Sequence, residues 1–205
     1  MSSKTTVAVV AVIVIVVIAA AAAALALWSG DGGDSGTDAP DTPTENPLMN
    51  DLTELDIGDE LMFDVSGSYA NRYASYTIDG TETYTVIGKT SDSVTFEVNG
   101  TTYARSGSQS VVFSQSNGDV KVWDMPDPDQ PHEDGVLDTP YGPVDVMIVD
   151  FDLPDTAAGY RVTDLGSYQY WTETGFGVKQ SMNYSIDSTN EVTKVTKTLV
   201  SVTTE

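Results

Sequence analysis

Cysteine is absent from this 205-residue chain, and histidine occurs only once. Without cysteine there is no disulfide, no cysteine-linked lipid and no Cys-based zinc site. The one histidine, His132, lies in a stretch rich in Asp and Pro, and a Ser-His-Asp triad would have to use it. No glycine-rich phosphate loop follows an expected strand. The sequence therefore predicts no catalytic residues, no metal ligands and no cofactor.

Positive charge is also scarce. Nine Lys and Arg stand against 31 Asp and Glu, which gives a net charge of -22. A surface with this charge repels nucleic acid and anionic headgroups, so we expect no nucleic-acid partner. The acids are spread along the chain, which favours a solvated surface over a cation site. Cation binding by the acidic stretch from Asp124 to Asp138 is left open.

Long apolar runs are missing everywhere except in residues 7–28, which begin at Val7 and end at Trp28 and carry no charge. About 22 residues of helix span about 33 Å, enough to cross a bilayer. Lys4 precedes this segment and acids follow it, so we expect residues 1–6 in the cytoplasm and the rest outside the cell. The segment predicts a single-pass signal anchor whose partner is the lipid bilayer. A signal peptide cleaved at an Ala-x-Ala site near Ala24 is the alternative, and it also exports the remainder.

The chain after the anchor divides into a tether and a domain. Residues 29–47 contain mostly Gly, Asp, Thr and Pro, a composition typical of a flexible acidic linker. Residues 48–205 are long enough for one extracytoplasmic domain with a core. At its start, Asn46-Pro47 is a favourable beginning for a short helix. Its leucines Leu48, Leu52 and Leu55 share one face, so we expect the helix to pack on the domain as a plug.

From Glu60 onward the apolar period becomes two, which predicts strands. Three dipeptides between alternating runs predict hairpin turns: Asp79-Gly80, Asn99-Gly100 and Asn117-Gly118. Residues 124–140 predict a long irregular loop, and residues 144–153 a strand that is apolar on both faces. We therefore expect a mainly β fold, an antiparallel meander of about ten strands that forms a curved sheet or half-open barrel.

Two sequence blocks and one short pattern carry a resemblance. The blocks are TPYGPVDVMIVDF from Thr139 and YQYWTETGFGVKQSMNYS from Tyr168, followed by a closing strand. This arrangement resembles the half-open antiparallel barrels of the lipoprotein-carrier class (LolA/LppX-like). The opening from Gly58-Asp59 to Gly67 is also similar to anchored archaeal surface β domains of unknown function. The first resemblance implies a sheet wrapped around an apolar groove, and the second implies no function.

Aromatic residues are the candidates for a ligand groove, because Tyr and Trp offer large amphipathic contact surfaces. The candidates are Trp123, Tyr141, Tyr168, Tyr170 and Trp171. The alternative is that they are ordinary strand residues. Two sequons, at Asn99 and Asn183, are possible glycosylation sites in an exported glycoprotein. Asn99 is the more accessible of the two if it lies in a turn.

These observations favour a membrane-anchored cell-surface protein that acts as a binding or interaction module. Its partner would be an unknown surface ligand or an envelope protein. Two alternatives stay open: a structural envelope or pilin-like subunit, and an envelope hydrolase. We expect the protein not to be an enzyme, because no pair of carboxylates is singled out by the sequence.

Overall fold

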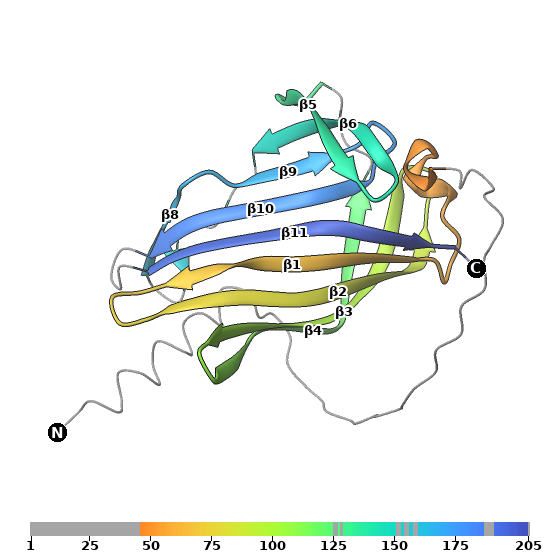
Figure 1. Ribbon diagram of the computed structural model, residues 1–205. Helices are drawn as coiled ribbons and strands as arrows, with labels where there is room; N and C mark the ends of the chain where they lie inside the picture. The colour runs from red at the N-terminus through yellow and green to blue at the C-terminus, as the bar shows by residue number, and fades with distance from the viewer. Residues whose placement is uncertain are drawn as a thin grey trace, which may run out of the picture.

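The computed structural model describes residues 46–124, 127, 129–150, 153, 156–157, 160–186 and 191–204. Within these residues the fold is mainly β, as predicted, and two short 3-10 turns precede the strands (Figure 1). The elements are η1 (Pro47–Met49), η2 (Leu52–Glu54), β1 (Glu60–Ala70), β2 (Ser75–Lys89), β3 (Ser93–Ser106), β4 (Gln109–Asp124), β5 (Glu133–Thr139), β6 (Gly142–Asp150), β7 (Thr156–Ala157), β8 (Tyr160–Asp164), β9 (Tyr168–Trp171), β10 (Gly177–Ile186) and β11 (Glu191–Thr203).

The strands form one antiparallel, strongly curved and open sheet (Figure 1). Its order is β4-β3-β2-β1-β11-β10-β9-β6-β5, with the short strand β8 beside β10 and β7 beside β8. Strands that follow one another in the chain are neighbours along most of this path, and β1 and β11 pair in the middle. The order is that of an up-and-down barrel in which one pair, β4 with β5, is not formed. We call this unformed pair the seam.

The predicted alternation is confirmed in β1, where exposed and buried residues alternate from Glu60 to Val65. Phe63 and Val65 face the interior, whereas Met62 and Asp64 face outward. The sequence predicts the last strand at residues 192–202, and the structure has β11 at Glu191–Thr203, one residue longer at each end. β1 has its charged residues on the outer face, and this pattern specifies its register in the sheet, whereas the inner face of β11 also carries the buried Glu191 and Thr193.

The three predicted hairpin turns are wrong. Gly80 and Gly100 lie inside β2 and β3, and Gly118 lies inside β4 at a bulge with a φ of 76°. The real turns are elsewhere: the β1–β2 turn is built on Asn71, whose Oδ1 accepts hydrogen bonds from the backbone N–H groups of Tyr73 and Ala74.

The glycines inside β2 and β3, Gly80 and Gly100, allow neighbouring backbones to come very close. A Cβ on Gly80 would lie 2.6 Å from Thr102 Cα, and one on Gly100 would lie 2.8 Å from Glu82 Cα. Gly67 of β1 is in the same position against β11. In the β1–β2 register Gly67 lies opposite Ile78, two residues from Gly80. In the β2–β3 register Gly80 lies opposite Thr102, two residues from Gly100. The three glycines therefore form a diagonal across the sheet. Glycines and bulges of this kind let a sheet coil, and here they accompany its strong curvature.

The predicted plug is present, but it consists of two 3-10 turns and not of one helix. Asn46 caps the first turn through a 3.0 Å hydrogen bond from Leu48 N–H to its Oδ1. Leu48, Leu52 and Leu55 are buried in the main core cluster, beside Phe176 from the β9–β10 connection. The backbone N–H of Leu52 donates to the carbonyl of Thr174, which ties the plug to that connection.

The predicted long loop is partly wrong. Its second half is the edge strand β5, in which Val136 and Leu137 pair with Asp145 and Val144 of β6. Its acids point to solvent, which is the pattern of a protected edge strand and not of a loop. The strand predicted to be covered on both faces is β6. Val144, Val146 and Met147 are all buried there.

The predicted anchor at residues 7–28 and almost all of the predicted linker lie outside the described residues. Among the residues that the structure does describe, no helix has the length and apolar character needed to cross a membrane. The anchor, its orientation and the export of the domain therefore stay predictions from the sequence.

Candidate functional site

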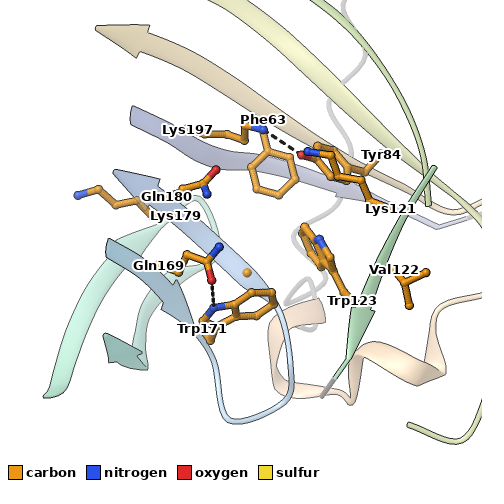
Figure 2. A pocket seen from close by; sticks show the side chains of 11 residues that line it. Phe63, Tyr84, Lys121, Val122, Trp123, Gln169, Trp171, Lys179, Gln180 and Lys197 are labelled. Carbon is orange, nitrogen blue, oxygen red and sulfur yellow. Dashed lines mark hydrogen bonds between the residues drawn. The ribbon is translucent and has the colours of Figure 1, made fainter. Parts of the chain in front are cut away.

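A cavity of about 340 Å³ lies beside the unpaired edge of β4, where the end of that strand faces β9 and β10 (Figure 2). Its residues come from six strands on both sides of the seam. The lining consists of Phe63, Tyr84, Lys121, Val122, Trp123, Gln169, Trp171, Gly177, Lys179, Gln180 and Lys197. The volume is within the lower part of the range of small-molecule sites.

Aromatic rings form the walls of this cavity. Trp123 of β4 and Trp171 of β9 meet edge to face with ring centroids 5.4 Å apart, although β4 and β9 are not hydrogen-bonded neighbours. Phe63 and Tyr84 lie 6.1 and 5.3 Å from Trp123, measured between ring centroids. Such contacts contribute about 0.5–1.5 kcal/mol beyond the burial of area. The aromatic contact therefore holds the end of β4 against β9 where backbone pairing is missing.

A buried ion pair lies on the same inner face. Lys197 is on the side of β11 that also carries the buried Val195 and Leu199, and its ammonium nitrogen lies 2.5 Å from Glu82 Oε2. The two side chains are only 13% and 12% exposed. The same ammonium donates a 2.9 Å hydrogen bond to the Tyr84 hydroxyl (Figure 2). A buried lysine requires such partners, because a desolvated charge without them is very unfavourable.

Tyr84 is the residue that joins the aromatic and charged parts of the site. Burial raises the pKa of its phenol well above the usual value, and Glu82 raises this pKa further, whereas the nearby Lys121 ammonium lowers it. Lys121 and Lys197 both lie near the Tyr84 ring, with their ammonium nitrogens 5.8 and 5.3 Å from its centroid. The phenol is therefore neutral at physiological pH, and its hydroxyl donates a 3.3 Å hydrogen bond to Glu82 while it accepts one from Lys197.

The structure brings together two of the five aromatic residues proposed for the groove, Trp123 and Trp171. Tyr141 packs on the main core, and its hydroxyl bonds to the backbone N–H and carbonyl of Val202. Tyr168 is 39% exposed and lies outside the lining. Tyr170 is on the other side of β9 from Trp171, with the Lys179 ammonium 4.9 Å from its ring centroid. A ligand role for any of the five stays a prediction.

The sequence reasoning missed the lysines and glutamines of the cavity. A signal for Lys197 was present, because in β11 the apolar positions Val195 and Leu199 share a face and Lys197 occupies the position between them. Gln180 is paired directly with Lys197, and Gln169 is paired with Gln180. Polar residues that continue the buried face of neighbouring strands indicate a site. The contribution of Lys121 could not be read in this way, since it depends on the curvature of β4.

No match to a known family accompanies this geometry. The chain matches no protein-family model, no curated protein and no solved structure. The resemblances noted in the sequence are therefore neither supported nor opposed, and the site is interpreted from its own residues.

A second and smaller cavity, of about 180 Å³, lies at the plug and carries acidic residues. Asp51, Glu54, Asp56 and Asp59 are among the residues that line it. Nowhere in the described part of the chain do three or more His, Cys, Asp or Glu side chains converge in a way that could hold a metal ion. His132, at the seam connection, instead contacts the Gln130 carbonyl and the Asp134 carboxylate, at 2.8 and 3.4 Å.

Both sequon asparagines are in strands. Asn99 is not in a turn, contrary to the prediction: it lies in β3, where its amide donates to Glu97 and its Oδ1 accepts from Gly118 N–H. The Asn183 amide in β10 donates to the carbonyl of Leu165. In each case the nitrogen that would carry a glycan is already engaged. Glycosylation stays a prediction, and the greater accessibility expected for Asn99 has lost its basis.

Proposed function

We propose that this protein is a membrane-anchored cell-surface binding module that holds a small molecule in the cavity beside β4. One observation carries the proposal: an aromatic-walled cavity of about 340 Å³ opens beside the edge of β4 that pairs with no other strand in the described part of the chain. Concave sites with mainly apolar walls and a few convergent polar groups are the usual binding sites of small molecules. The sequence of residues 7–28 supports placement at the cell surface.

The experiment measures ligand binding by tryptophan fluorescence. The full chain is reconstituted in phosphatidylcholine nanodiscs with Trp28→Phe, so that Trp123 and Trp171 alone report. A panel of neutral and charged aromatic compounds and oligosaccharides is then titrated. We expect at least one class to change the emission with a Kd below about 1 mM.

Two variants test whether the cavity is the site. Trp171→Ala removes one wall, and we expect it to weaken binding at least tenfold. Tyr73→Ala removes an aromatic ring that is 70% exposed in the β1–β2 turn, and we expect it to bind as the parent does. A panel without any binding compound, or equal binding by the Trp171→Ala variant, refutes the proposal.

A structural envelope subunit is the second candidate, and the exposed edge of β4 favours it. This edge strand has a backbone without a partner on one side, and its exposed valines are Val111, Val112, Val120 and Val122. Long apolar edge strands promote pairing between chains. Light scattering of the detergent-solubilised chain tests this function: assembly that Val120→Lys abolishes supports it, and a monomer at all concentrations excludes it.

A further inference from the structure

The charge of the cavity is opposite to the charge of the molecule. Asp and Glu outnumber Lys and Arg by 31 to 9 in the chain, yet every charged residue in the lining is a lysine. These are Lys121, Lys179 and Lys197. One third of all basic residues therefore gather at one site, and no described carboxylate belongs to its lining. Charge that departs from the average in this way indicates complementarity to a ligand of opposite sign.

The three lysines are not equivalent. Lys197 is neutralised by Glu82, to which it is bound at 2.5 Å. Figure 2 shows the Lys179 side chain extending away from the aromatic walls, and its ammonium lies over the Tyr170 ring. Lys121 and Lys179 both have no described carboxylate within ion-pair distance of their ammonium groups, but only Lys121 lies on the face of β4 that carries Trp123. The lining thus has two lysines without a described carboxylate partner, and the one beside the aromatic walls is Lys121.

Lys121 also has the right position to receive an anion. It precedes Trp123 by two residues in β4, so both side chains point to the same face of that strand. Its ammonium is 5.8 Å from the Tyr84 ring centroid, at the end of the cavity where the Tyr84 hydroxyl lies (Figure 2). The Tyr84 hydroxyl itself donates to Glu82 and accepts from Lys197, so a carboxylate here would receive its charge-assisted hydrogen bond from the Lys121 ammonium. The rest of such a ligand would lie against Trp123 and Trp171.

We propose that the ligand is a small aryl acid: a flat ring system of one or two rings that carries a single carboxylate. The carboxylate binds the Lys121 ammonium, and the rings lie against Trp123 and Trp171. This inference rests on the proposed function, because it names the ligand class of the same cavity. It adds that the charge of the ligand, and not only its apolar surface, determines binding.

The test compares 2-naphthoate with 2-naphthamide, which have the same shape and differ in charge. Both are titrated into the full chain in phosphatidylcholine nanodiscs at physiological ionic strength, with the tryptophan readout described above. We expect 2-naphthoate to bind at least tenfold more tightly than 2-naphthamide, because the charge-assisted hydrogen bond is available only to the acid.

Two lysine variants locate the effect. Lys121→Met keeps the length of an exposed side chain and removes its charge, so the preference for the acid should fall to less than about threefold while the binding of 2-naphthamide stays unchanged. Lys194→Met removes a charge from the outer face of β11 and serves as the matched control. It should keep the full preference.

The outcomes are distinguishable. Equal affinity for the acid and the amide, or an undiminished preference in Lys121→Met, overturns the inference and leaves the binding function standing. If neither compound binds and no compound of the wider panel changes the tryptophan emission, the proposed function itself fails.

Discussion

The glycine diagonal supplies the sharpest prediction about the fold. In Gly80→Ala the new methyl group would lie 2.6 Å from Thr102 Cα and closer still to the carbonyl oxygen of Thr101. Carbon atoms in contact are normally about 3.5–4.0 Å apart, so the β2 and β3 backbones would have to separate by about 1 Å. Both strands are held by neighbours on their other sides, and therefore the sheet cannot relax freely.

The expected cost follows from this overlap. Forcing one extra methyl group into a packed site costs about 1–3 kcal/mol. We expect a value near the upper end, about 2–3 kcal/mol, because the obstructing atoms belong to the backbone and cannot change rotamer. For a domain of this size each kcal/mol lowers Tm by about 2–4 °C, so Gly80→Ala should lower Tm by about 4–12 °C.

Gly88→Ala is the matched control, since it makes the same change in the same strand. A Cβ at Gly88 would lie 3.7 Å from Thr95 Cβ, an ordinary contact. Alanine also restricts the unfolded chain, so Gly88→Ala should be neutral or more stable by about 0.5 kcal/mol. Thermal unfolding followed by circular dichroism measures both variants. Equal Tm values for Gly80→Ala and Gly88→Ala would refute the role assigned to the glycine diagonal.

Three further predictions concern the core, the ion pair and alkaline pH. Leu52→Ala should destabilise the domain by about 2–5 kcal/mol in urea unfolding, because Leu52 is fully buried in the plug, whereas Met49→Ala at the exposed neighbouring turn should be neutral. Lys197→Met should cost about 3–5 kcal/mol by leaving Glu82 buried and unpaired, and adding Glu82→Gln should recover most of this loss; an unchanged urea midpoint in the single variant contradicts the pairing. Stability should fall as the pH rises above about 10, since burial raises the folded-state pKa of three tyrosines above the unfolded value and only the unfolded chain then releases their protons. These tyrosines are Tyr69, Tyr84 and Tyr184, and urea midpoints at about pH 9 and about pH 11 check the trend.

Sequence patterns predicted the strands well and the turns poorly, for a physical reason. Alternation reports which side chains are buried, and this property decides the register of a strand such as β1. Asn-Gly and Asp-Gly pairs report only that the backbone can adopt unusual geometry or a close approach. In a long coiled sheet that freedom is used within strands, as at Gly80 and Gly118, and not to reverse the chain.

The sequence predicted two of the residues that line the cavity, Trp123 and Trp171. Trp123 and Trp171 were chosen because they are aromatic, but Tyr141 and Tyr168 satisfied the same criterion and lie elsewhere. The distinction depends on how far β4 curls toward β9, which no local pattern encodes. The cavity lysines are not among the sequence candidates, which are all aromatic. Lys197 could have been identified from the sequence, because it lies on the inner face of β11 between the buried Val195 and Leu199.

The pairing of β1 with β11 has a consequence for the order of assembly. Glu60 lies opposite Thr203, so the centre of the sheet joins the beginning of the domain to its end. Until β11 is available, β1–β4 and β5–β10 are two separate half-sheets, each with an extra exposed edge and an open core. Closing such a long loop is slow, and the contacts that reward it come late. Export of the domain is a prediction from the sequence; an exported chain would benefit from this delay, because it could not reach its stable state before β11 had crossed the membrane.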